Sequence, residues 1–305
     1  MLFSIIIPSY NYASRITCAI ESALDQQGDD FEIIVMDDGS TDDTQKKVSH
    51  YCDLHKGVVK YYFQENKGPS VARNNGVKQS RGEYLLFLDA DDQLLHNALD
   101  LFRDFIQKSP QTDFIFGGHV SVYADGMTKK QNAPALSNNN EKNFIGFLRK
   151  KFGSISHGSA IMKRHIFDKL KYPCDIRNNE DIVLFSHILL LYNCASFQEP
   201  VVNIFKHKGS LRHNLEMVRL AGTKVTDLIF NPDILPPHLM KRHDEFYSKR
   251  CLSQFRLLFL AGHYKEAKAM YHRAMVVYPK NIFKISYLKK YLKTHIYVLI
   301  FWLQA

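Results

Sequence analysis

A cluster of carboxylates follows an apolar run near residue 90. Residues 84–88 form a short, unbroken apolar stretch, which predicts a buried strand. Asp89, Asp91 and Asp92 come directly after it. If the backbone stays extended, Asp89 and Asp91 point to the same side, where they suit one hard divalent cation that also binds phosphate. The alternative is a loop in which Asp91 or Asp92 caps the next helix.

The elements that position these acids alternate between strands and helices. Strands are predicted at residues 3–7, 32–36, 58–63 and 84–88, with the first strand breaking at Pro8. Helical spacing of apolar residues, or a predicted helix start, follows each of the first three strands. This alternation predicts a parallel sheet with helices on both faces, a Rossmann-like α/β fold.

Polar residues follow each of the four predicted strands. In sheets of this kind, ligands bind at the carboxyl ends of the strands. One polar cluster could arise by chance, whereas four in the same geometric position indicate a site. The clusters are Pro8-Ser9-Tyr10, Asp37-Asp38-Gly39, Asn66-Lys67-Gly68 and Asp89-Ala90-Asp91.

Five motifs together resemble one family, the family 2 glycosyltransferases of the bacterial polysaccharide type, which have the GT-A fold. Each motif alone is weak, but five in the family's order over the first two thirds of the chain are highly specific. They are IIIPSYN (5–11), IIVMDDGSTDDT (33–44), NKGPSVARNNGV (66–77), SRGEYLLFLDADD (80–92) and NNEDIVLFSHIL (178–189).

The resemblance implies a donor site for a sugar nucleotide. A carboxylate can accept the imide N–H of uracil, a tyrosine ring can stack on the base, and Mn²⁺ or Mg²⁺ would offset the charge gained by the leaving diphosphate. By resemblance, the nucleotide base, usually uracil, contacts Pro8, Tyr10 and Asp38. Arg73 lies beside the nucleotide, Asp89 contacts the ribose or sugar, and Asp91 binds the metal.

The resemblance also implies an acceptor site in the second half. Glu180 and Asp181 open an apolar helix, where acids also stabilise the helix through its dipole. By resemblance, Asp181 is the base that takes the proton of the acceptor hydroxyl, and Glu180 is its neighbour in the acceptor site. His157 either lines the acceptor pocket or is structural. His207 resembles a histidine near the metal and diphosphate, although Ile204-Phe205-Lys206 replaces the usual Tyr-Arg before it.

The composition limits the classes of molecule that are expected to bind the chain. The chain has 305 residues and a formal charge of +9, which suits an anionic partner such as a sugar nucleotide or a membrane surface. No nucleic-acid-binding motif is visible, so nucleic acid is not expected. Five scattered cysteines indicate neither a disulfide framework nor a zinc site. No secretory signal is recognised, and a cytoplasmic location is expected.

The chain is expected to divide near residue 212. Residues 1–212 would form the GT-A domain, with a nucleotide-binding half (1–92) and an acceptor half (93–212), and residues 213–305 a helical extension. Residues 260–281 resemble one tetratricopeptide unit, for which a helical hairpin is the expected structure.

The C-terminal segment 283–305 combines apolar residues with lysines. Its final apolar run of eight residues is too short to cross a bilayer, which needs about twenty. The segment could be an in-plane amphipathic helix on an anionic membrane or a helix packed on the protein. The first alternative would make the protein peripheral at the cytoplasmic face of the inner membrane.

These observations predict an inverting, metal-dependent glycosyltransferase of the hexosyl or N-acetylhexosaminyl class. It would move a sugar from a nucleoside diphosphate, usually UDP, to a hydroxyl of a glycan or a lipid-linked glycan. One alternative is a catalytically inactive interaction module built around the tetratricopeptide-like hairpin. Another is a sugar-nucleotide nucleotidyltransferase, although the Gly-rich N-terminal loop usual in those enzymes is missing.

Overall fold

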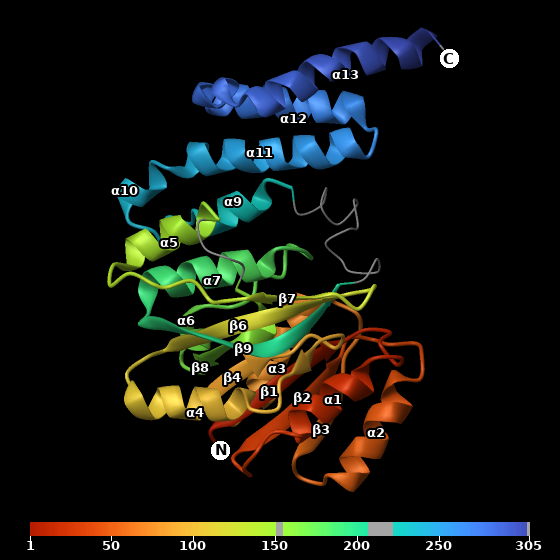
Figure 1. The fold of residues 1–305 in the computed structure, drawn as a ribbon, viewed down its shortest axis with the longest axis vertical. Helices are drawn as coiled ribbons and strands as arrows, with labels where there is room; N and C mark the ends of the chain where they lie inside the picture. The colour runs from red at the N-terminus through yellow and green to blue at the C-terminus, as the bar shows by residue number, and fades with distance from the viewer. Residues whose placement is uncertain (151–154, 207–221, 304–305) are drawn as a thin grey trace. The chain divides into compact units, whose positions relative to one another are not determined.

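A mixed sheet of nine strands lies within the described part of the chain (Figure 1). The structure, a computed structural model, describes residues 1–150, 155–206 and 222–303, with side chains up to residue 294. The strands lie in the order β3-β2-β1-β4-β8-β6-β9-β5, and β7 pairs with β6. They are β1 (Phe3–Ser9), β2 (Phe31–Asp37), β3 (Val59–Phe63), β4 (Tyr84–Phe87), β5 (Gln93–Leu94), β6 (Phe114–Tyr123), β7 (Thr128–Gln131), β8 (Ala160–Lys163) and β9 (Cys194–Lys206).

Most of the pairing that positions the site is parallel. Strands β1 to β4 are mutually parallel, so their carboxyl ends meet at one edge of the sheet. Strand β8 runs antiparallel to both β4 and β6, and β9 is parallel to β6. The predicted GT-A-type architecture, a mostly parallel sheet with helices and a C-terminal helical extension, is confirmed.

The first strand does not break at Pro8, as the sequence predicted, but continues to Ser9. Ile6 accepts a hydrogen bond from the backbone N–H of Leu88, so alternate residues of β1, including Pro8, face β4. Pairing between β1 and β4 ends at Ile6. The missing N–H of Pro8 therefore removes no hydrogen bond from the ladder.

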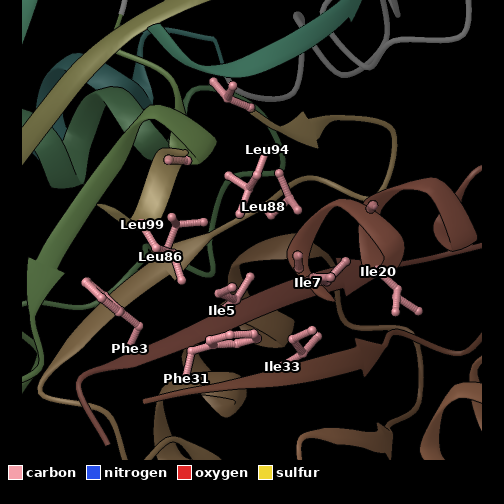
Figure 2. Close-up of a cluster of buried hydrophobic side chains, with 14 of the residues drawn as sticks. Phe3, Ile5, Ile7, Ile20, Phe31, Ile33, Leu86, Leu88, Leu94 and Leu99 are labelled. Carbon is pink, nitrogen blue, oxygen red and sulfur yellow. The ribbon is translucent and has the colours of Figure 1, made fainter. Parts of the chain in front are cut away.

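Helices cover both faces of the parallel part of the sheet. Ile5 and Ile33 share a buried cluster with Ile16 and Ile20 of α1, which Figure 2 shows in part. On the other face Gly76 of α3 lies so close to Ile6 that an added Cβ would stand 2.4 Å from its Cγ2. The helices before β9 are α1 (Ile16–Leu24), α2 (Thr44–Leu54), α3 (Pro69–Gln79), α4 (Ala98–Lys108), α5 (Asn140–Leu148), α6 (Ile166–Lys169) and α7 (Glu180–Leu191), with a 3₁₀ turn, η1 (His157–Ser159).

The core strands are apolar on both faces. Ile5, Ile6, Ile33 and Ile34 are all fully buried, which is the pattern of strands covered by helices on two sides. Burial of one such side chain contributes about 1.5–3 kcal/mol to folding. The core therefore fixes the strand ends at which the polar loops begin.

The chain divides into two compact units, which are Met1–Cys174 with Leu184–Lys208, and Asp175–Val183 with Gly209–Ala305. Residues 175–183, predicted to belong to the first domain, group with the second unit. Asp175 pairs with Lys224 at 3.5 Å, and Asn179 accepts a hydrogen bond of 3.5 Å from Arg250. The predicted boundary at residue 212 lies outside the described residues.

The second unit is helical. Its core is a cluster between α11 and α12 that includes Leu252, Phe255 and Tyr271, and Gly262, with φ +80°, lies in the turn between the two helices. The side chain of Asn281 donates to Ser248 Oγ at 2.6 Å and ties the turn after α12 back to α11. The elements are α9 (Lys224–Ile229), α10 (Pro237–Met240), α11 (His243–Leu260), α12 (Tyr264–Val277), η3 (Pro279–Phe283) and α13 (Ile285–Leu303).

Candidate functional site

Polar loops meet at the carboxyl ends of β1 and β2. The backbone N–H of Asn11, a residue with φ +56°, donates to Ser40 Oγ at 2.8 Å. Asn11 Oδ1 in turn accepts from the backbone N–H of Thr41 at 2.8 Å. These reciprocal bonds join the loop after β1 to the loop after β2. The ring of Tyr10, between β1 and this junction, is 46% exposed and therefore accessible to a planar ligand.

Asp38 organises a third loop. Its buried carboxylate accepts hydrogen bonds from Gln64 Nε2 at 2.7 Å and from the backbone N–H groups of Lys67 and Gly68, both at 2.8 Å. An ionised carboxylate has about four acceptor positions, so three of them hold the loop between β3 and α3. The motif did not reveal that Asp38 holds this loop. About one acceptor position of its carboxylate is left for an imide N–H.

The approach of the second and third loops requires a glycine. Gly39 has φ +84°, and a Cβ built there would stand 2.8 Å from the backbone nitrogen of Asn66. Any side chain would be strained in this conformation and would push the loop away. The Asp-Gly pair of the motif therefore fixes the entry to α3.

Arg73 and Asp89 form the central ion pair of the site. Arg73 Nη2 donates to Asp89 Oδ1 at 2.8 Å, and the guanidinium lies 5.4 Å from the centre of the Tyr172 ring. Arg73 is buried, whereas the Asp89 side chain is 35% exposed. Burial opposes ionisation of Asp89, but Arg73 and then His157 outweigh it and hold its pKa well below the ordinary value. Asp89 is thus an oriented carboxylate with an accessible edge.

His157 lies on the other side of Asp89. Its Nδ1 is 3.9 Å from Asp89 Oδ2, and the ring is buried against Tyr172 and Phe185, with ring centres 5.6 and 5.5 Å away. Its Nε2 is buried and has no hydrogen-bond partner among the described residues. Of the two sequence interpretations, an acceptor contact and a structural role, neither anticipated this approach to Asp89, 68 residues earlier in the chain.

The charges of the acids after β4 raise the pKa values of neighbouring groups. Asp92 is buried and accepts a hydrogen bond from the backbone N–H of Phe205 at 3.0 Å. Burial and the charges of Asp89 and Asp91 raise its pKa well above the ordinary value. Burial, followed by the charges of Asp91, Asp89 and Asp92, raises the pKa of Tyr12 to about 12. Tyr12 therefore belongs to this environment, although it follows the first motif and no sequence signal pointed to it.

A divalent cation fits this donor set when part of its coordination comes from a ligand. Within the described residues no three His, Cys, Asp or Glu side chains form a ready-made cage. Arg73 engages Asp89 and the Phe205 backbone engages Asp92, while Asp91 is partly exposed. Mg²⁺ is usually bound in this way, through one or two carboxylates and substrate phosphates. His207, predicted as a further ligand, lies outside the described residues.

Glu180 and Asp181 occupy the first turn of α7 and belong to the second unit. Glu180 is buried, whereas Asp181 is partly exposed and its Oδ1 accepts the backbone N–H of Ile182 at 2.8 Å. Asn179, with φ +65°, turns the chain into the helix. Burial lowers the pKa of Arg250, and the charge of Asp181 opposes that shift, so the two side chains interact electrostatically.

The structure therefore distributes the predicted residues over two units. The first unit brings Arg73, Asp89 and His157 into contact and holds Asp91 beside them in the chain. Pro8, Tyr10 and Asp38 lie at the ends of the neighbouring strands of that unit. Glu180 and Asp181 are in the second unit.

Similar structures support the fold. S. aureus TarS 1–349 in complex with UDP-GlcNAc matches with a TM-score of 0.65 and 19% identity, over 96% of this chain and 90% of that one. A mannosyltransferase from Pyrobaculum calidifontis, in complex with GDP-Man and Mn²⁺, matches with a TM-score of 0.56 and 14% identity, over 97% and 84% of the two chains.

Similar sequences carry glycosyltransferase names. The GalNAc(5)-diNAcBac-PP-undecaprenol beta-1,3-glucosyltransferase of Campylobacter jejuni is 28% identical over 88% of this chain and 85% of its own length. An uncharacterized glycosyltransferase of Rickettsia bellii is 34% identical over 61% of this chain, but the match spans only 26% of that longer protein.

The profile of the family described as Glycosyl transferase family 2 matches residues 4–171, more than half of the chain. That stretch contains four of the five motifs, the strand-end loops and the Arg73–Asp89 pair. The chain therefore belongs to the family 2 glycosyltransferases and is an enzyme of sugar transfer.

Proposed function

We propose that the enzyme is an inverting, metal-dependent transferase of a hexose or N-acetylhexosamine. Its donor would be a UDP-sugar, and its acceptor a hydroxyl of a glycan or lipid-linked glycan. The observation that carries the proposal is the oriented Asp89 carboxylate, fixed by Arg73 at the strand ends and followed at once by Asp91. Membership of this family favours the proposal over a nucleotidyltransferase, and the presence of Asp91 and Asp181 favours it over an inactive interaction module.

In this proposal the donor lies across the carboxyl ends of β1, β2 and β4. The exposed ring of Tyr10 stacks on the base, Pro8 packs beside it, and the remaining acceptor position of Asp38 receives the imide N–H. Asp89 accepts hydrogen bonds from hydroxyls of the ribose or sugar. Because Arg73 fixes the carboxylate before the donor arrives, little side-chain freedom is lost on binding.

Asp91, with His207 as a second ligand, would hold Mn²⁺ or Mg²⁺ against the diphosphate. When bound, the ion offsets the negative charge that the leaving nucleoside diphosphate gains. Asp92, tied to the backbone of Phe205, would keep the end of β9 against the acids. The raised pKa of Asp92 supports a cationic ligand there, because a cation would relieve the crowding of carboxylates.

Asp181 is the proposed base. It takes the proton of the acceptor hydroxyl while that oxygen forms a bond to the anomeric carbon and the bond from this carbon to the diphosphate oxygen breaks. A single displacement of this kind inverts the anomeric configuration. The partial exposure of Asp181, in contrast to the burial of Glu180, supports the choice between the two, and Glu180 would assist in the acceptor site.

The proposed acceptor follows from a similar protein. The name of the C. jejuni relative includes a PP-undecaprenol-linked glycan, and that match covers most of both chains. A similar acceptor would place this enzyme at the cytoplasmic face of the inner membrane. None of the helices that the structure describes is long and apolar enough to span a membrane.

The test combines binding and product analysis. Calorimetry with UDP, in Mn²⁺ and then in chelator, should show at least tenfold tighter binding with the metal. A screen of UDP-sugars with a lipid-linked glycan acceptor should then give a product whose anomeric configuration, read by NMR, is opposite to that of the donor. Equal affinity for UDP with metal and with chelator, or a product with retained configuration, would overturn the respective part of the proposal.

A further inference from the structure

The C-terminal part of the sequence has a one-sided charge. Glu266 is the last acidic residue, and residues 267–305 contain no Asp or Glu. The same stretch has seven basic residues, which are Lys268, Arg273, Lys280, Lys284, Lys289, Lys290 and Lys293. Such a segment attracts anionic surfaces and repels a second copy of itself.

The same region exposes large apolar side chains. Phe283 in η3 is 82% exposed, and Ile285 and Leu292 in α13 are 63% and 57% exposed. Val276, near the end of α12, is 81% exposed. Single exposed apolar residues are normal, but here five of them, including Ile282 at 48% exposed, lie within 17 residues of a chain segment that has no acid.

Helix α13 already has a packed side. Tyr291 stacks on Tyr271 of α12 with ring centres 4.2 Å apart, and Tyr287 and Leu288 pack against the core of the hairpin. Thr294 is buried on this side as well. Helix α13 therefore packs on the hairpin through one of its faces.

The opposite side is exposed and mixes apolar side chains with lysines. Ile285, Lys289, Leu292 and Lys293 follow one another at spacings of four, three and one residues, which places them on one face, and all four are exposed. These four residues and the exposed Phe283, two residues before the helix, are what we name the basic apolar face. A helix face directed only at water would be expected to carry polar residues throughout.

We propose that the basic apolar face is a docking surface for an anionic lipid bilayer. The inference deepens the proposed function and rests on it, because a lipid-linked acceptor is held at a membrane surface. Phe283, Ile285 and Leu292 would enter the boundary between headgroups and acyl chains, and the lysines would contact anionic headgroups. The anchor is thus the start of α13 and the turn before it.

The first measurement is cosedimentation of the full chain with vesicles. Vesicles of phosphatidylcholine with about a third phosphatidylglycerol should bind the protein, and pure phosphatidylcholine vesicles should bind it at least tenfold more weakly. Binding should weaken as salt rises, because exposed charges are screened. Equal binding to both kinds of vesicle, or no binding to either, would overturn the proposal.

Matched variants locate the surface. A lysine near an anionic surface contributes about 1 kcal/mol, which is about fivefold in affinity, so Lys289→Gln with Lys293→Gln should weaken binding about 25-fold. The control is Lys129→Gln with Lys130→Gln, two exposed lysines of β7. Phe283→Ser with Ile285→Ser should weaken vesicle binding at least tenfold. The control is Leu54→Ser with Met127→Ser, at two positions of the first unit that are both 63% exposed, and it should change vesicle binding little. Equal losses in a variant and its control would contradict the assignment.

Two further readouts separate this inference from its alternatives. UDP affinity should be unchanged in all four variants, so failure of vesicle binding and failure of the donor proposal give different results. Light scattering should show the same mass for the wild type and for Phe283→Ser with Ile285→Ser. A wild-type dimer that this variant dissociates would assign the face to a second copy of the chain and refute the bilayer.

Discussion

Asp89 Oδ1 accepts a hydrogen bond from Arg73 Nη2 at 2.8 Å, and this bond joins α3 to the end of β4 across 16 residues of sequence. The guanidinium is buried and the carboxylate is partly accessible. The pair therefore fixes Oδ1 of Asp89 and leaves the rest of the carboxylate accessible to a ligand. In the proposed donor site, structure and ligand binding would therefore depend on the same side chain.

Asp89→Asn should weaken both the fold and donor binding. The amide keeps the shape but loses the charge opposite Arg73, and loss of a partner of this kind costs about 1–3 kcal/mol. Urea denaturation should show that loss, and calorimetry should show weaker UDP-sugar binding. Asp104→Asn, at an exposed position of α4, is the control. If Asp89→Asn were as stable as the control, the pair would be of no structural consequence.

Asp91→Ala should affect binding without affecting stability. Asp91 is partly exposed, and its removal relieves repulsion with its acidic neighbours. The gain in UDP affinity that Mn²⁺ gives the wild type should disappear, while the midpoint of thermal unfolding without ligand should stay the same or rise. A variant that still responds to Mn²⁺ as the wild type does would show that the metal binds elsewhere.

His157→Asn should change the use of the donor more than that of the acceptor. Its imidazole supports Asp89 from the side opposite Arg73 and contacts Tyr172. The expected result is a KM for the donor raised several-fold, with a KM for the acceptor within twofold of the wild type. His50→Asn, at an exposed position of α2, should change neither. A raised acceptor KM alone would instead support the acceptor contact expected from the sequence.

Asp181→Asn should separate binding from transfer. The asparagine is nearly isosteric but cannot accept the proton, so transfer should fall by about two to four orders of magnitude. Calorimetry with UDP should give the wild-type affinity, because Asp181 is proposed to act on the acceptor. Transfer retained within a few-fold would reduce Asp181 to an acid that stabilises the start of α7.

Ionisation of Glu32 should contribute to the way the free energy of unfolding depends on pH in acid. The buried carboxylate accepts from Ser4 Oγ at 2.7 Å, Lys60 Nζ at 2.8 Å and the backbone N–H of Arg81 at 2.7 Å. Burial alone would raise its pKa, but these bonds outweigh it and lower the pKa. The stabilisation is therefore present above the unfolded value of about 4.3 and is lost as the pH falls through the folded value.

Glu32→Gln should accordingly be less stable than the wild type at pH 7, by about 1–3 kcal/mol. The difference should shrink as the pH falls below 4, because the wild type then loses the same charge. Urea denaturation at a series of pH values measures it. A difference that is constant from pH 7 to pH 3 would contradict the role of the ionised carboxylate.

The sequence predicted what depends on local pattern. The β1, β2 and β4 runs are apolar on both faces, so their periodicity and their polar ends indicated the sheet and its binding edge. The contacts of His157 and Tyr172 with the Arg73–Asp89 pair could not be predicted, because they depend on how β8 pairs with β4. The spacing in α13 also left its packed and exposed sides undecided, since Leu288 and Leu292 have the same residue type and opposite environments.

The three hydrogen bonds to Asp38 have a mechanical consequence. They hold residues 64–68, and α3 begins at Pro69. The carboxylate is therefore connected through these residues to the first turn of the helix that carries Arg73. A base that displaces the Asp38 carboxylate would also displace the start of α3 and shift the Arg73 guanidinium against Asp89. In the proposed donor site, recognition of the base would then change the position of Asp89, which is proposed to contact the ribose or sugar, without any change in the sheet between them.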